Sequence, residues 1–356
     1  MREDKEFLKE LLTAPSPSGQ EEKALEIWDK FMASFSGKYY SDKIGNSAWS
    51  IGRGDIKILL SGHIDQVNAR VSLIHDNGLL AIHYTGGIDN RSLPGSKVDI
   101  LLDSGKIIRG RVIKRAMHND KPSSWPEDHY DFKQIRVDIG AESKEEVENL
   151  GIHPGNLVCY SPEVNLEFGK NRICSTSLDD KVAVYIVARV MKKLAKSIVS
   201  EDPAWAKKYQ VIGLAATQEE TGLRGATIAS KNISPNISID IDVTFATDDE
   251  MTENKEELGD IKLGKGPVLS YGADKSRKLN MALSEIAKTL GTEYQTESTR
   301  AGGTNTDAIQ LNSPDCETTH IAIPNRSMHS QCEVCDWRDI DACIELLCQA
   351  IISEKL

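Results

Sequence analysis

Apolar residues recur at intervals of three and four positions along several stretches of this chain, which is the spacing of one buried helical face. The pattern predicts a helix over residues 3–12, a break in the Pro- and Gly-containing stretch 15–19, and a second helix after it. Ser18 is followed three residues later by Glu21, so Ser18 is the expected cap of that second helix. Further helices are expected at residues 143–150, where Ser143 is the expected cap, and at 180–198, 225–230, 276–290 and 336–353.

Short and nearly continuous apolar runs alternate with these helices and predict buried strands. They cover residues 57–60, 211–216, 237–243 and 318–323. Because strands and helices alternate in this way, the sequence predicts an α/β fold built on a central sheet.

The pattern changes between residues 70 and 167, where short strand-like segments are separated by turn sequences. Such spacing is typical of a small β-barrel or sandwich. We therefore expect two units: an α/β domain formed by residues 1–68 and 168–356, and an inserted all-β domain formed by residues 69–167. A chain of 356 residues is long enough for two units of this size.

Composition and charge narrow the class of protein. The 43 basic and 54 acidic residues give a net charge of -11, which argues against a nucleic-acid binder, because phosphate binding needs basic patches. No apolar run reaches the roughly 18 residues of a membrane helix, and the charged first residues lack the apolar core of a signal peptide. We expect a cytoplasmic protein with no membrane partner. The seven cysteines are irregularly spaced, and Cys332 and Cys335 form a C-x-x-C without a second pair, so ordinary thiols are expected.

Residues that can ligate metals follow the predicted strands or begin a predicted helix. Six of them form the candidate set: His63, Asp179, Glu219, Glu220, Asp242 and His329. Open α/β sheets bind ligands at the carboxyl ends of their strands, so we expect these side chains to meet at one edge. Successive residues leaving a strand point in different directions, so one of the two adjacent glutamates can hold a metal while the other faces a reacting water. The set predicts a two-metal hydrolase.

Each of these residues has a simpler explanation when it is taken alone. Asp179 at the start of a helix would serve as a cap, and two adjacent glutamates would be solvated. Asp240 competes with Asp242, because alternation along a strand puts both side chains on the same face. A shared site is favoured by the joint occurrence of all six residues in one order along the chain.

That order resembles metallopeptidase family forty-two, which includes tetrahedral aminopeptidases, glutamyl aminopeptidases and proteins once labelled endoglucanases. The resemblance covers nearly the whole chain and rests mainly on Gly62-His63-Ile64-Asp65, Asp179-Asp180, Gln218-Glu219-Glu220-Thr221-Gly222, Asp242-Val243-Thr244 and Met328-His329-Ser330. Two departures bear on substrate preference and assembly rather than on the reaction. They are Asn305-Thr306 in a glycine-rich segment and the polar, aromatic loop of residues 121–130.

The resemblance implies a zinc-exopeptidase-type catalytic domain, whose mixed central sheet is flanked by helices, and an inserted barrel-like dimerisation domain. It also implies two metal ions in each subunit. His63, Asp179 and Asp242 would hold one ion, and Asp179, Glu220 and His329 would hold the other. Ligands of this mixed type suit zinc, and also cobalt or manganese.

The resemblance implies roles for three further features of the site. Glu219 would be the general base, and Asp65 would orient His63, as carboxylates commonly do for histidine ligands. The peptide bond between Asp179 and Asp180 would be cis, as in related di-metal exopeptidases.

The implied activity is that of a metal-dependent aminopeptidase, which removes N-terminal residues from short peptides with a water molecule that bridges two metal ions. The implied assembly is a homo-oligomer in which dimers form a tetrahedral dodecamer. Two alternatives stay open. A related di-metal amidohydrolase, either a carboxypeptidase or a deacylase, would recognise a carboxylate through Arg300 or Arg326. A non-enzymatic protein would use the β insert to bind peptides or to assemble.

Overall fold

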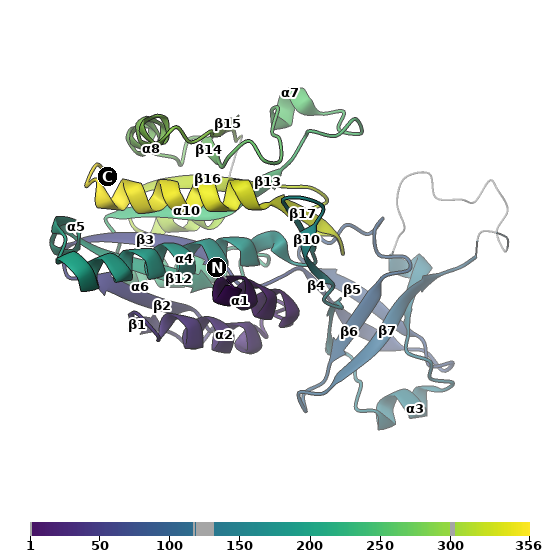
Figure 1. Ribbon diagram of the computed structural model, residues 1–356. Helices are drawn as coiled ribbons and strands as arrows, with labels where there is room; N and C mark the ends of the chain where they lie inside the picture. Colours follow the sequence, from purple (N-terminus) through teal and green to yellow (C-terminus); the bar gives the residue numbers. More distant parts are fainter. Residues whose placement is uncertain (1, 117, 119–131, 300–302) are drawn as a thin grey trace.

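The structure is a computed structural model that describes residues 2–116, 118, 132–299 and 303–356. These residues form an α/β unit around an eight-stranded sheet and a separate, closed six-stranded barrel. Figure 1 shows the barrel projecting from one side of the α/β unit. The architecture confirms the predicted fold class, a mixed α/β domain interrupted by an all-β barrel. The loop of residues 121–130 lies outside the described residues.

Eight strands form the large sheet: β1 (Gly37–Ser41), β2 (Ser47–Gly52), β3 (Ile56–His63), β12 (Tyr209–Ala216), β13 (Ile237–Phe245), β14 (Val268–Tyr271), β15 (Gln295–Ser298) and β16 (Glu317–Asn325). Their order is β1-β2-β12-β3-β13-β16-β14-β15. The four central strands, β12, β3, β13 and β16, run parallel to one another, and they contain the four apolar runs predicted as strands. Their carboxyl ends therefore lie at one edge of the sheet, which is where ligands bind in folds of this kind.

Helices cover both faces of the sheet. One face packs against α1 (Arg2–Thr13), α2 (Glu22–Met32), α4 (Leu178–Glu201), α5 (Ala204–Lys208), α8 (Arg277–Leu290) and α10 (Trp337–Ile352). The other face packs against α6 (Arg224–Ile233) and α9 (Asn305–Asn312), and the short α7 (Lys255–Leu258) follows β13. None of the helices that the structure describes is long and apolar enough to cross a membrane.

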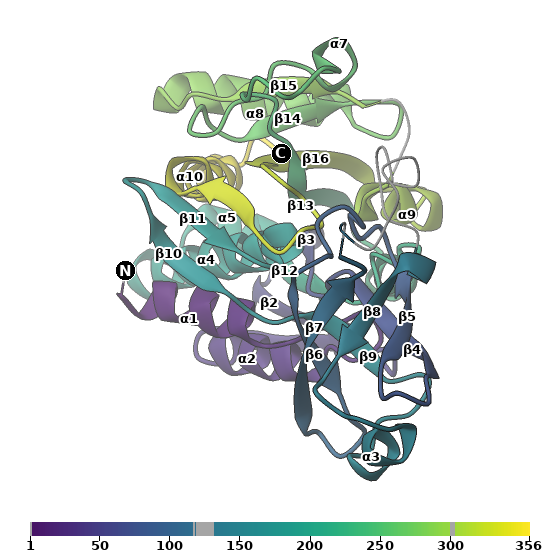
Figure 2. The same ribbon diagram turned by 90° about the vertical axis from the view of Figure 1, so that its right-hand side faces the viewer.

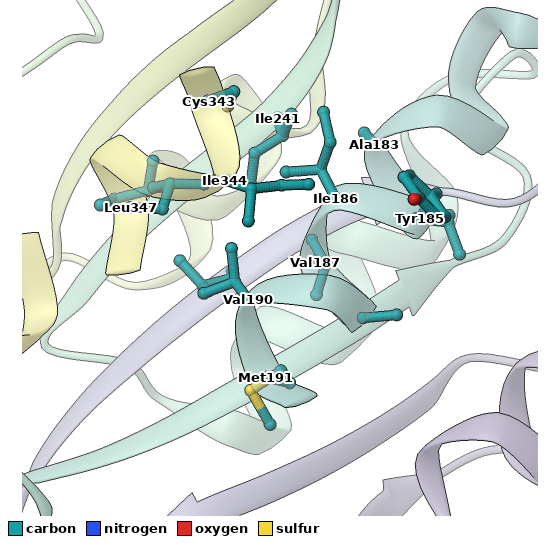
Figure 3. Close-up of a cluster of buried hydrophobic side chains, with 14 of the residues drawn as sticks. Ala183, Tyr185, Ile186, Val187, Val190, Met191, Ile241, Cys343, Ile344 and Leu347 are labelled. Carbon is teal, nitrogen blue, oxygen red and sulfur yellow. The ribbon is translucent and has the colours of Figure 1, made fainter. Parts of the chain in front are cut away.

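The main core lies between α4, α10 and the sheet. Figure 3 shows Ile186 and Val190 of α4 beside Ile344 and Leu347 of α10, with Ile241 of β13 next to them. These positions recur at helical spacing in both helices, so a single apolar face of each is removed from water. Burial of one such side chain contributes about 1.5–3 kcal/mol. The start of α4, which carries Asp179, is thus anchored to the sheet.

The barrel consists of β4 (Asn68–Ile74), β5 (Leu80–Thr85), β6 (Lys97–Leu101), β7 (Ile107–Lys114), β8 (Ile135–Asp138) and β9 (Leu157–Tyr160), closed in the order β4-β5-β8-β7-β6-β9. It has its own apolar core, separate from that of the α/β unit. Figure 2 shows the barrel from this side, with α3 (Lys144–Asn149) at the end far from α8. The predicted cap of α3 is confirmed, because the Ser143 side chain accepts a hydrogen bond from the backbone N–H of Glu146.

A small third sheet joins distant parts of the chain. It contains β10 (Val164–Phe168), β11 (Arg172–Ser175) and β17 (Glu333–Asp336). Strand β10 includes residues on both sides of the expected division at 167 and 168, so the limits of the insert stay a prediction.

The predicted capping box of the second helix is wrong. Helix α2 begins at Glu22, with Glu21 in the cap position and no side-chain cap bond. The Ser18 hydroxyl instead donates to Oδ2 of Asp65 at 2.6 Å, and Oε1 of Glu21 accepts from the backbone N–H of Gly19 at 2.7 Å. Both side chains hold the loop beside the candidate site. Ser18 does so because the buried carboxylate of Asp65 is a stronger partner than the helix end.

Candidate metal centre

The residues predicted from the sequence gather at the carboxyl edge of the parallel strands. All of them are described by the structure: His63, Asp65, Asp179, Glu219, Glu220, Asp242 and His329. Six of them line a cavity of about 450 Å³, and Asp65 lies behind it, fully buried. The register explains the convergence, since His63 ends β3 directly beside Ala216 of β12, and the two glutamates follow β12.

Asp179 lies between two imidazoles and directs one carboxylate oxygen toward each. Its Oδ1 is 3.0 Å from Nε2 of His63, and its Oδ2 is 3.1 Å from Nε2 of His329. Oδ1 of Asp242 is 3.9 Å from Nε2 of His63, and Oε1 of Glu220 is 3.4 Å from Nε2 of His329. The five side chains therefore form two groups of three that share Asp179, and the ligand atoms within each group lie within 4.8 Å of one another.

This donor set fits two divalent cations. Oε1 of Glu220 is buried and has no hydrogen-bond partner among the described residues, as expected for an atom that would bind a cation. Mixed imidazole and carboxylate donors are those that zinc, cobalt and manganese accept. A carboxylate shared between the groups would also offset the repulsion of two adjacent cations.

The backbone around Asp179 departs from helical geometry at the start of α4. Asp179 and Asp180 have non-helical φ and ψ angles, and the peptide bond between them is cis, which confirms what the resemblance implied. Oδ2 of Asp180 accepts a hydrogen bond from the backbone N–H of His63 at 3.1 Å. Asp180 thus ties the end of β3 to the start of α4, and it keeps His63 beside Asp179.

Asp65 contacts three parts of the site. Its carboxylate accepts from the backbone N–H of Glu219 at 2.9 Å and from that of Glu220 at 3.3 Å. Nδ1 of His63 is 3.1 Å from the Asp65 carbonyl oxygen and 3.5 Å from the Asp65 carboxylate. A proton on Nδ1 would be donated to this carbonyl, which leaves the lone pair of Nε2 directed into the site.

Electrostatics in the cavity favour added positive charge. Burial raises the pKa of Glu219 to about 8, and burial together with the nearby Asp179 raises that of Glu220 to about 8. Burial lowers the pKa of His329, but the hydrogen bond to Asp179 and the negative charges of Glu220 and Asp179 together outweigh it, and the pKa rises to about 10. The buried carboxyl groups of Glu219 and Glu220 therefore retain protons at neutral pH, and a bound cation would displace these protons.

The structure gives Asp240 and Asp242 different surroundings. Asp240 shares a face with Asp242 as expected, but its Oδ1 accepts from the hydroxyl of Ser61 at 2.6 Å, and it does not line the cavity. Asp248 pairs with Arg326 at 2.8 Å, so one of the two arginines that the carboxypeptidase or deacylase alternative would use has an internal partner. Arg300 lies outside the described residues.

Glu333 is a site residue that the sequence interpretation missed. It is 2% exposed, and its Oε2 accepts from the backbone N–H of Asp179 at 2.8 Å while its Oε1 accepts from that of His329 at 3.1 Å. A carboxylate that binds backbone groups leaves no spacing pattern in the sequence, although its position four residues after His329 is a signal that could have drawn attention.

The fold and the convergence of donors at the strand ends are those of peptide hydrolases of the metal-dependent aminopeptidase class. Residues 45–346 match the family model described as M42 glutamyl aminopeptidase. The chain belongs to this family, and the resemblance inferred from the motifs is confirmed.

Relatives and solved structures extend the comparison over nearly the whole chain. The lysyl aminopeptidase of Pyrococcus furiosus is 29% identical over 355 residues, which are 99% of this chain and 97% of the relative. An aminopeptidase from the archaeon Desulfurococcus kamchatkensis is 30% identical with a TM-score of 0.88, covering 99% of this chain and 95% of the other. The TET1 peptidase of Pyrococcus horikoshii, which can assemble into a tetrahedron or a large octahedral shell, is 27% identical with a TM-score of 0.82, covering 97% and 98%.

Proposed function

We propose that this chain is a two-metal aminopeptidase that hydrolyses the N-terminal peptide bond of short peptides. The observation that supports it most directly is the position of Asp179, which has one oxygen 3.0 Å from His63 and the other 3.1 Å from His329. A carboxylate shared by two donor groups is the arrangement that two adjacent cations need. Zinc is the first candidate for both positions, with cobalt or manganese as alternatives.

In this proposal the ions are held by two overlapping groups: His63, Asp179 and Asp242, and Asp179, Glu220 and His329. Two bound ions would supply Lewis acidity, which lowers the pKa of a water toward 7 and polarises the scissile carbonyl.

Glu219 is the proposed general base because it lines the cavity but belongs to neither donor group. Its Oε2 lies 3.9 Å from Nε2 of His63. There it can take a proton from the attacking water and pass it to the departing nitrogen. Asp65 holds the backbone N–H of Glu219 at 2.9 Å, and we propose that it positions the base as well as His63.

The proposed ions favour a substrate with a free amino group. A neutral α-amino group would bind one of the two ions held by the two donor groups, whereas the lone pair of an acylated nitrogen is delocalised into its carbonyl and binds metals poorly. The carboxypeptidase or deacylase alternative needs a cation for the substrate carboxylate. No arginine is among the described residues that line the cavity, and Arg326 is paired with Asp248.

We also propose that the chain assembles through its β-barrel into dimers and then into a tetrahedral dodecamer. The support is the likeness to the Pyrococcus horikoshii TET1 peptidase, which can assemble into a tetrahedron. Light scattering should then give twelve times the chain mass of 39.3 kDa.

The activity is tested by comparing a short peptide that has a free N-terminus with the same peptide after N-acetylation. The free peptide should lose residues from its N-terminus, the acetylated peptide should not, and chelation with EDTA should stop the reaction until zinc, cobalt or manganese is restored. Equal cleavage of both peptides would favour the deacylase or endopeptidase alternative. Cleavage that persists after thorough chelation would exclude metal catalysis.

A further inference from the structure

The cavity is lined by charged side chains that belong to neither donor group and that are not Glu219. Two are acidic, Glu297 of β15 and Glu257 of α7, and one is basic, Lys275. These residues line the same cavity as the proposed catalytic residues. Their charges and partners therefore bear on which N-terminal residue the site accepts.

Glu297 is held by neutral hydroxyl groups. Its Oε1 accepts from the Ser270 hydroxyl at 2.5 Å, and its Oε2 accepts from the Thr244 hydroxyl at 2.6 Å. Among the described residues, no lysine, arginine or histidine forms an ion pair with it. An ionised carboxylate offers about four acceptor positions, so Glu297 keeps unused capacity on both oxygens.

A chain of two hydrogen bonds, through Ser270 to His320, fixes the orientation of Glu297. The single hydroxyl proton of Ser270 goes to Glu297, so Nδ1 of His320, 2.8 Å from the Ser270 oxygen, is the donor in that contact. Ser270 and Glu297 are also register partners on the paired strands β14 and β15. The carboxylate is therefore held in place before any ligand arrives.

The positive charge of Lys275 is already neutralised. Its Nζ donates to Oδ2 of Asp274 at 2.6 Å, and its side chain is 2% exposed. The Asp307 side chain also interacts with Asp274, so a second carboxyl group lies beside this ion pair. A substrate carboxylate would have to displace Asp274 to reach Lys275.

We infer that the cavity selects basic N-terminal residues, lysine or arginine, and that Glu297 is the counter-ion of the substrate side chain. The inference rests on the proposed aminopeptidase activity and names its substrate class. A cationic side chain supplies the charge that Glu297 lacks, and its N–H groups match the unused acceptor positions. An acidic side chain meets the negative charge of Glu297, and Lys275, the basic residue that lines the described part of the cavity, is already paired with Asp274.

The test compares p-nitroanilides of lysine, arginine, norleucine and glutamate on the zinc-loaded full chain. Norleucine matches the length of lysine without its charge, so the ratio of the two kcat/KM values isolates the charge. We expect lysine and arginine to exceed norleucine by at least about tenfold, and glutamate to be the poorest substrate.

The decisive variant is Glu297→Gln, which keeps the size of the side chain and removes its charge. The ratio of lysine to norleucine should fall by at least about tenfold, and a partial loss of folding would cancel in this ratio. Glu256→Gln is the matched control, since Glu256 is exposed and does not line the cavity, and its ratio should equal that of the wild type.

A preference for glutamate or norleucine, or an unchanged ratio in Glu297→Gln, would overturn the basic preference and leave the aminopeptidase activity standing. If none of the substrates is cleaved with any of the metals, the proposed function fails and the inference fails with it.

Discussion

The carboxylate of Glu333 accepts a hydrogen bond from the backbone N–H of Asp179, with 2.8 Å between Oε2 and the nitrogen. Its other oxygen accepts from the backbone N–H of His329 at 3.1 Å. Glu333 begins β17, which pairs with β11, and β11 ends four residues before Asp179 in the chain. The buried side chain of Glu333 thus fixes the backbone of Asp179, which both donor groups share, and the backbone of His329, which belongs to one of them.

Replacement of Glu333 by glutamine should weaken metal binding. A carboxamide has one acceptor oxygen, so one of the two backbone N–H groups would lose its partner. Changes to residues that orient metal ligands typically cost 10–100-fold in metal affinity, and we expect a loss of about that size, measured by competition with a chromophoric chelator. Glu26→Gln, at an exposed position of α2, is the control. Unchanged affinity in Glu333→Gln would mean that this residue does not support the site.

Replacement of Glu219 and replacement of Glu220 by glutamine should have different effects on metal content and turnover. Glu219→Gln should keep both metal ions but lose about 10²–10⁴-fold in kcat, because the general base is gone. Glu220→Gln should lose the ion beside His329, because it removes a proposed ligand. Metal content and turnover, measured on the same preparations, distinguish the two effects. A Glu219→Gln enzyme with full turnover, or one depleted of metal, would contradict the assigned roles.

Metal binding should release protons at neutral pH. Burial lowers the pKa of His329, but Asp179 and Glu220 together raise it, to about 10, and burial raises the pKa of Glu220 to about 8. Below these values the protonated groups must lose their protons before they can bind a cation, so apparent affinity should rise as pH increases from about 6 to 8. Calorimetric titration in two buffers of different ionisation enthalpy measures the protons released. Affinity that is independent of pH would contradict this view of the site.

Gly62→Ala should destabilise the fold and perturb the site together. A Cβ atom at Gly62 would lie 2.8 Å from the Cβ of Ala183 and 3.0 Å from its backbone carbon, so β3 and α4 would have to separate. Overpacking of this kind costs about 1–3 kcal/mol, and it would move His63 away from Asp179. The control is Gly37→Ala, where an added Cβ meets nothing within 4 Å. Denaturant unfolding measures the loss of stability, and metal content measures the change at the site. Equal stability and equal metal content in Gly62→Ala and Gly37→Ala would contradict this prediction.

The central sheet and the convergence of the candidate residues could be predicted because one physical rule covers both. The apolar runs that form β3, β12, β13 and β16 are buried on both faces, and parallel strands bring their carboxyl ends to one edge. Strand β1 was not predicted because it is half-exposed and lacks an apolar run, and β14 and β15 were missed because each has only four residues.

Residues that act on the backbone could not be found from spacing. Ser18 and Glu21 match a capping box, yet the Ser18 hydroxyl donates to Asp65, which only the folded chain brings near, and Glu21 accepts from the backbone N–H of Gly19. Glu333 is likewise defined by the two backbone N–H groups it accepts from. Alternation could not separate Asp240 from Asp242, and the hydrogen bond from Ser61 distinguishes them.

The sharing of Asp179 by two ions is tested most directly by anomalous diffraction from crystals of the zinc-loaded protein. Two peaks are expected about 3.5–4 Å apart, one beside His63 and Asp242 and the other beside His329 and Glu220. Each ion should lie about 2.0–2.2 Å from a different oxygen of Asp179. A single peak, or a pair of peaks with no Asp179 oxygen between them, would contradict the two-metal site.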